Sequence, residues 1–99
     1  MKLIWLPSAV QDLTTTVDYL RERADPSTVN RFARRIHAVA TQLEEMPYMG
    51  HVTPEDDRFR EFHIPGSTIN LIYRVFEQEG EIQLRSVFDT RRLRFDDWD

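Results

Sequence analysis

The chain has 99 residues, a formal net charge of −4 and no cysteine. This length suits a single domain over residues 1–99, and the lack of cysteine excludes disulfides and thiolate metal sites. The negative charge argues against a strong, non-specific nucleic-acid binder. The apolar run at residues 3–6 is too short for a signal-peptide core or a membrane span, so we expect a cytoplasmic protein with no membrane attachment.

The first elements are predicted from a short apolar run and a helical stripe. Residues 2–6 (KLIWL) indicate a strand covered on both faces and closed by Pro7. Ser8 and Gln11 have the spacing of a capping box, which predicts that a helix begins at Ser8. The apolar side chains of this helix share one stripe, formed by Val10, Leu13, Val17 and Leu20.

A second helix follows at once. Asp25 and Pro26 suit the N-cap and first helical positions, and Pro47 predicts an end near Met46. Its apolar positions are Val29, Phe32, Ala33, Ile36, Ala40 and Leu43. We expect the two helices to form an antiparallel hairpin that covers one face of a sheet. Residues 47–57 are predicted to be a loop.

The second half contains three runs of alternating side chains, residues 60–64, 68–76 and 82–89. Pro65-Gly66 suits a type II turn between the first two, and a charged loop with Gly80 separates the last two. These runs predict an antiparallel meander. The fold class is therefore α+β with the order β-αα-βββ, a helical hairpin packed on a small, mostly antiparallel sheet.

Alternation also predicts the two faces of this sheet. The buried face would carry Ile69, Leu71, Tyr73, Val75, Ile82, Leu84, Ser86 and Phe88. The open face would carry Glu61, His63, Asn70, Ile72, Arg74, Phe76, Gln83, Arg85, Val87 and Asp89. We expect Glu61 and Asp89 to neutralise part of the charge of Arg74 and Arg85. The open face is either a binding site or a solvated face with cross-strand ion pairs.

Residues 90–99 (TRRLRFDDWD) combine a basic group with apolar side chains. This tail either packs back onto the domain or stays mobile and binds a partner. Its arginines either contact a target or pair with the neighbouring acidic residues. No two histidines have a metal-binding spacing, and we predict neither a metal nor a cofactor.

A set of local phrases occurs in a fixed order along the chain. Trp5-x-Pro7-x-Ala9 precedes the first helix, and the others are LEEMPYMG (43–50), REFHIPG (60–66), IYRV (72–75) and LRSVFDTRR (84–92). Together they resemble the RelE/ParE family of bacterial type II toxin-antitoxin toxins. The resemblance implies a toxin wrapped by the C-terminal segment of a cognate antitoxin, with DNA reached only indirectly through the antitoxin. We expect helix-in-groove or strand-addition contacts at the first helix and the sheet edge.

The family has two branches with different targets. RelE-like members cleave mRNA on the ribosome, and here they would use Arg60, Arg74 and Arg85 with His63 as a base. However, no Tyr, His or Lys follows Tyr73, and the chain is acidic. We therefore favour the ParE-like branch, which is not enzymatic, poisons DNA gyrase and arrests growth.

For contact with the target, we predict a set of tail residues: Arg91, Arg92, Arg94, Phe95 and Trp98. A non-toxic antitoxin-binding module is a third alternative.

Overall fold

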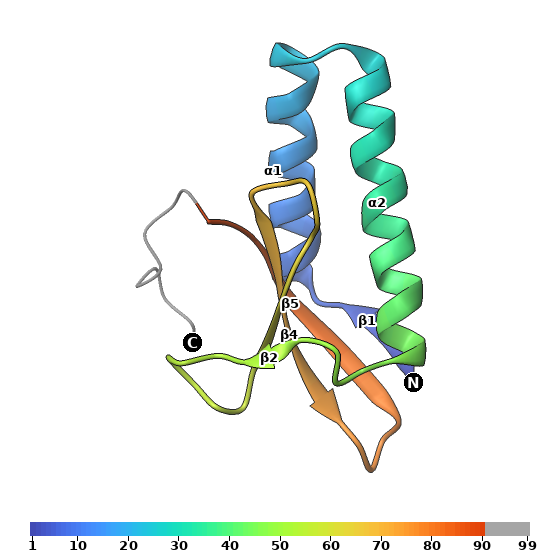
Figure 1. The fold of residues 1–99 in the computed structure, drawn as a ribbon, viewed down its shortest axis with the longest axis vertical. Coiled ribbons are helices and arrows are strands. Elements are labelled where there is room, and N and C mark those ends of the chain that lie inside the picture. Colours follow the sequence, from blue (N-terminus) through green and yellow to red (C-terminus); the bar gives the residue numbers. More distant parts are fainter. Residues whose placement is uncertain (91–99) are drawn as a thin grey trace.

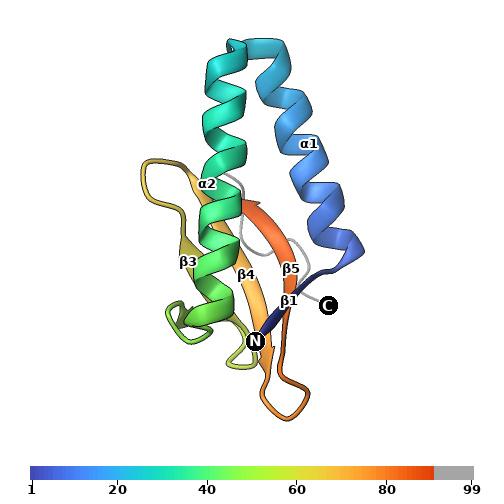
Figure 2. The same ribbon diagram turned by 90° about the vertical axis from the view of Figure 1, so that its right-hand side faces the viewer.

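The computed structural model describes residues 1–90. The elements are β1 (Lys2–Trp5), α1 (Pro7–Arg23), α2 (Pro26–Glu45), β2 (His51–Val52), β3 (Arg60–His63), β4 (Ile69–Phe76) and β5 (Glu81–Asp89). The predicted α+β fold is confirmed, because a helical hairpin lies against a five-stranded sheet (Figures 1 and 2). The structure adds the two-residue strand β2 within the segment predicted to be a loop.

The strands follow the order β1-β5-β4-β3-β2 across the sheet. β1 runs parallel to β5, and every other neighbouring pair is antiparallel. The outer edge of β1 is closed by the end of α2, because the Glu44 carboxylate accepts the Leu3 N–H at 3.1 Å. Strand addition at β1 is therefore disfavoured, which leaves the β2–β3 side as the more accessible edge.

Local rules decide how both helices begin. α1 begins at Pro7, so the predicted capping box at Ser8 is wrong. Proline suits the first helical position because its missing N–H would have no partner there. The Ser8 hydroxyl instead donates to the Arg85 carbonyl and ties α1 to β5. In α2 the predicted cap is confirmed, since Asp25 accepts the Thr28 N–H at 2.9 Å.

The main core lies between the helices and the sheet. Its fully buried centre includes Ala9, Leu43, Tyr73, Ile82 and Leu84. The predicted stripe of α1 is wrong at Val10, which is 48% exposed because it lies one residue further round the helix than the buried Ala9. In α2, Val39 is buried whereas Ala33 is exposed.

A β-bulge changes the sidedness of β5. Tyr73 lies opposite Leu84, whereas Ile72 lies opposite Ser86, so Arg85 is an extra residue in its strand. Beyond the bulge, Val87 enters the main core and Phe88 lies on the other face. The predicted faces are therefore wrong for these two residues, because one inserted residue reverses every later position in an alternating strand.

The face of the sheet away from the helices is partly covered. Phe59, from the loop before β3, packs with Ile72 and Phe88 in a second small apolar cluster. Phe59 is 8% exposed and Ile72 is 2% exposed. This cluster lies between His63 and Asn70 at one end of the open face and Arg74 at the other end.

Candidate functional sites on the two faces of the sheet

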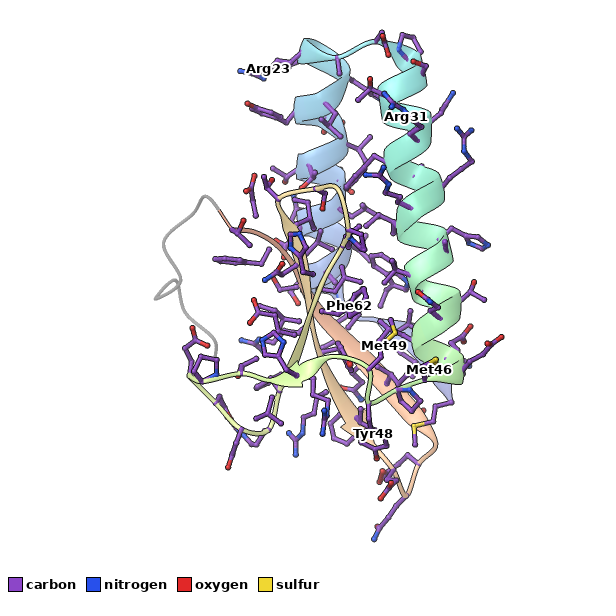
Figure 3. All side chains as sticks on the ribbon, in the orientation of Figure 1. Arg23, Arg31, Met46, Tyr48, Met49 and Phe62 are labelled. Atoms are coloured by element: carbon purple, nitrogen blue, oxygen red, sulfur yellow. The ribbon has the colours of Figure 1, made fainter. Side chains whose placement is uncertain are left out.

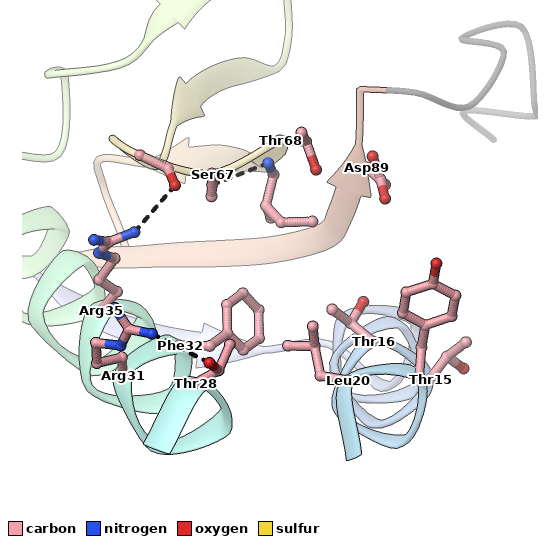
Figure 4. Close-up of a pocket in the computed structure, with 13 residues that line it drawn as sticks. Thr15, Thr16, Leu20, Thr28, Arg31, Phe32, Arg35, Ser67, Thr68 and Asp89 are labelled. Atoms are coloured by element: carbon pink, nitrogen blue, oxygen red, sulfur yellow. Dashed lines mark hydrogen bonds between the residues drawn. The ribbon is translucent and has the colours of Figure 1, made fainter. Parts of the chain in front are cut away.

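A groove of about 510 Å³ lies between the helical hairpin, the β3–β4 turn and the end of β5. Its apolar lining includes Leu20 of α1 and Phe32 of α2, which Figure 4 labels. Ile69 of β4 also lines the groove. The helices project past the ends of the strands at this place (Figure 2), so their apolar stripe continues beyond the sheet. We call this feature the hairpin groove.

The rim of the hairpin groove is polar. It carries hydroxyl groups from Thr15, Thr16, Thr28, Ser67 and Thr68. Arg31 and Arg35 line the α2 side (Figure 4), and neither has a carboxylate within ion-pair distance among residues 1–90. Because a guanidinium has five N–H donors, both side chains keep donors for an external anion.

The turn at Gly66 fits closely against α2. Arg35 donates to the Gly66 carbonyl at 3.2 Å. Gly66 has a φ of +76°, and a Cβ on it would lie 2.9 Å from the Arg35 guanidinium. Glycine therefore permits both the turn and the close approach of Arg35. This contact fixes the position of one wall of the hairpin groove.

On the open face, two arginines are stacked on aromatic rings. The Arg74 guanidinium lies 4.6 Å from the ring centre of Phe76, and that of Arg85 lies 5.4 Å from that of Phe59. Within the described residues, neither arginine forms an ion pair. We call Arg74 and Arg85 the open-face arginine pair. The aromatic rings restrain their guanidinium groups without neutralising the charge.

The carboxylates expected to neutralise this pair lie elsewhere. Asp89 lies opposite Ile69 and lines the hairpin groove on the other face of the sheet. The Glu61 side chain is 4% exposed; it accepts a hydrogen bond from the Asn70 amide and lies 3.7 Å from His51 Nε2. The expectation that Glu61 and Asp89 neutralise the arginine pair is therefore wrong, because the bulge and the Asn70 contact place them differently.

His63 has an orienting partner that sequence reasoning did not identify. Its Nδ1 lies 2.7 Å from the Asn70 Oδ1. An amide oxygen only accepts hydrogen bonds, so Nδ1 carries the proton and Nε2 is the acceptor of the neutral ring. The two residues are opposite each other on β3 and β4. A search for polar cross-strand pairs could have found it.

A sequence model of the family described as "ParE toxin of type II toxin-antitoxin system, parDE" matches residues 3–94. The chain belongs to the ParE toxin family. A solved structure described as the chromosomal ParDE TA system from P. aeruginosa has the same fold, with a TM-score of 0.76 and 21% sequence identity over 90% of this chain and 95% of that chain. Among curated proteins, no relative matches.

In this ParE-family chain, Arg60 lies apart from the other two arginines proposed for RNA cleavage. It pairs with Tyr73 in the sheet register and donates to the Gly50 carbonyl at 2.8 Å. Its guanidinium stacks 4.9 Å from the Tyr48 ring centre. Tyr48 lies on the segment after α2, at the far end of the molecule from Arg23 and Arg31 (Figure 3). Arg60 thus holds this segment in place.

The tail residues predicted to contact the target lie outside the described residues. These are Arg91, Arg92, Arg94, Phe95 and Trp98. Within residues 1–90, no group of three or more His, Asp or Glu residues could hold a metal ion. In the same range, no helix is both long and apolar enough to cross a membrane.

Proposed function

We propose that this ParE-family chain is the toxin of a toxin-antitoxin pair, that it poisons DNA gyrase, and that a cognate antitoxin neutralises it. The observation that carries the proposal is the family match over residues 3–94. The family implies an antitoxin partner. The gyrase-directed branch is favoured because no Tyr, His or Lys follows Tyr73 and because the chain is acidic.

The hairpin groove supports the antitoxin part of this proposal. Its apolar lining suits the apolar side chains of an amphipathic segment, and Arg31 and Arg35 suit carboxylates on the polar side of that segment. A helix-in-groove contact also agrees with the closed outer edge of β1. We therefore propose that an acidic, amphipathic segment of the antitoxin lies in the hairpin groove.

The arrangement of the basic groups favours gyrase over mRNA cleavage. A cleavage site needs its base and its cations around one phosphate. Here His63 lies opposite Asn70, and Arg74 is four residues further along β4, which is about 13 Å at the usual strand rise. The Phe59 cluster lies between them, and Arg60 contacts the segment after α2. Among residues 1–90, His63 and the three arginines are therefore not gathered around one point, which supports the proposal of a non-enzymatic toxin.

The first experiment is a purified assay of DNA gyrase with this chain, with and without an excess of antitoxin. We expect inhibited supercoiling or trapped DNA cleavage, and we expect the antitoxin to reverse it. An unrelated acidic protein in place of the antitoxin is the control. No effect on gyrase at verified concentrations would reject the gyrase proposal, and the same preparation would then be tested for mRNA cleavage on translating ribosomes.

The tail is proposed as the part that contacts gyrase. Changing Arg91→Ala together with Arg92→Ala should abolish inhibition while leaving antitoxin binding intact. The matched control is Arg21→Ala with Arg34→Ala, which removes the same charge from exposed positions on the helices. Full inhibition by the tail variant would overturn the tail assignment and leave the family untouched.

A further inference from the structure

We infer that the open-face arginine pair, Arg74 and Arg85, is a direct binding site for the phosphodiester backbone of DNA. The inference goes beyond the proposed function, in which DNA is reached only through the antitoxin. It concerns the face of the sheet opposite the hairpin groove. It also requires neither gyrase nor antitoxin, so it can fail or succeed independently of the gyrase proposal.

The first argument is the charge of this face. The chain is acidic overall, with 17 Asp and Glu against 13 Lys and Arg. Even so, none of these carboxylates within residues 1–90 forms an ion pair with Arg74 or Arg85. Two cations that have no ion-pair partner among residues 1–90 can bind an external anion.

The second argument concerns the interactions of the carboxylates near the arginine pair. The Asp56 carboxylate is bound by Arg58 at 2.6 Å, and Glu61 is buried beneath Asn70 and His51. Glu81, opposite Phe76, is also a diagonal neighbour of Arg74, but it forms no ion pair with Arg74 in the described structure. The carboxylates of Asp56 and Glu61 are therefore both held by other groups of the protein.

The third argument is geometry. Arg74 of β4 lies opposite Gln83 of β5, and Arg85 is two residues after Gln83 on β5. The two arginines are therefore diagonal neighbours on one face. In a regular antiparallel pair such neighbours lie about 7–8 Å apart, within reach of long side chains, and here Arg85 is the extra residue of the bulge. Phe76 and Phe59 restrain the guanidinium groups, which lowers the entropy lost on binding.

The shape of the face favours a polyanion with regularly spaced charges. A sheet face is a rigid surface, and the phosphates of a DNA strand repeat evenly along it. Guanidinium groups bind phosphate oxygens in a bidentate manner. Two contacts predict weak binding with a slope of about −1.8 for log affinity against log salt, so a fourfold rise in salt should weaken binding about tenfold.

The test is fluorescence anisotropy of a short labelled DNA duplex with the full chain at several salt concentrations. We expect Arg74→Gln with Arg85→Gln to weaken binding on the order of tenfold at low salt and to flatten the salt slope by about 1.8. Arg74→Lys with Arg85→Lys should restore part of the affinity. The matched control, Arg21→Gln with Arg34→Gln, removes the same charge elsewhere and should bind as the unaltered chain does.

Three results would overturn the inference. One is the absence of duplex binding at low salt, and another is an equal loss in the control variant, which would mean that only net charge matters. The third is stronger binding of a polyglutamate peptide than of the duplex, which would assign the pair to an acidic protein segment. Circular dichroism of each variant establishes that the fold is retained.

Discussion

The hairpin groove and the open face of the sheet both carry arginines, but in different settings. The hairpin groove has Arg31 and Arg35 at the rim of an apolar hollow, whereas the open face has Arg74 and Arg85 stacked on phenylalanine rings. In the described residues, none of the four arginines forms an ion pair. Because both sites are basic, the shape of each surface distinguishes the proposed partners. The apolar hollow suits an amphipathic protein segment, and the sheet face suits a polyanion with regularly spaced charges.

The largest expected effect comes from reversing the charge of the hairpin groove. Arg31→Glu with Arg35→Glu should weaken the antitoxin complex on the order of 100-fold or more, because two attractive contacts become repulsive. Inhibition of gyrase without antitoxin should not change. Calorimetric titration of the antitoxin measures the affinity. Arg21→Glu with Arg34→Glu is the control, and an equal loss in that variant would contradict a specific groove.

The stability of the two faces should also differ. Leu43→Ala, in the main core, and Ile72→Ala, in the Phe59 cluster, each fall in a class that costs about 2–5 kcal/mol of unfolding free energy. We expect Leu43→Ala near the upper end and Ile72→Ala near the lower end, because a small cluster beside solvent can collapse into the space. Urea unfolding measures both. An equal or larger cost for Ile72→Ala would show that the open face is as tightly packed as the main core.

A smaller loss of unfolding free energy is expected when the hydrogen bond between the Tyr73 hydroxyl and the Gly50 backbone is removed. Tyr73 is fully buried, and its hydroxyl accepts the Gly50 N–H at 2.9 Å. Burial also raises the pKa of Tyr73. Tyr73→Phe should cost about 1–2 kcal/mol of unfolding free energy, because the Gly50 N–H loses its partner. Hydrogen exchange of the Gly50 amide should then accelerate, and an unchanged rate would contradict this role.

Gly50→Ala provides a second perturbation of the same contact. A Cβ at this position would lie 2.6 Å from the Tyr73 hydroxyl oxygen and 2.7 Å from the Glu61 carbonyl oxygen. We expect this variant to be destabilised more than Tyr73→Phe, because the backbone at Glu61 cannot move away as a flexible side chain can. A smaller loss of unfolding free energy than for Tyr73→Phe would show that the segment after α2 adjusts freely.

The smallest effect concerns the titration of Asp56 on the open face. Hydrogen bonds from Arg58 lower the pKa of Asp56 from 3.8 to about 2. A lowered carboxylate pKa stabilises the fold above the unfolded value, and this contribution is lost as the pH falls from about 4 through about 2. Arg58→Gln should raise the pKa of Asp56 towards 3.8 in an NMR titration. Arg74→Gln should raise the pKa of Asp56 less than Arg58→Gln does. A larger rise in the Arg74 variant would show that Arg74, and not Arg58, is the main partner of Asp56.

Much of the fold was predictable because its signals are local. The N-cap at Asp25, the end of α2 before Pro47 and the turn at Pro65-Gly66 each follow from the chemistry of a few neighbouring residues. The identity and order of β3, β4 and β5 follow from alternation in the same way. The family could be predicted too, because its phrases lie along the chain in order.

The candidate sites depended on contacts between distant segments. The hairpin groove combines α1, α2, the β3–β4 turn and the end of β5, and no local pattern places Arg31 and Asp89 in the lining of one groove. The pairing of His63 with Asn70 required the register of two strands.

The sequence by itself determined the elements, their order and the family of this protein, because periodicity, caps and turns are short-range effects. Only the tertiary structure decided which side chains share a surface. The bulge at Arg85 places Val87 in the core, Phe88 on the open face and Asp89 in the hairpin groove. The bulge thereby places Asp89 on the opposite face of the sheet from the open-face arginine pair. The physical reason is that strand register is set by packing across the sheet, and one extra residue reverses the side chains that follow it.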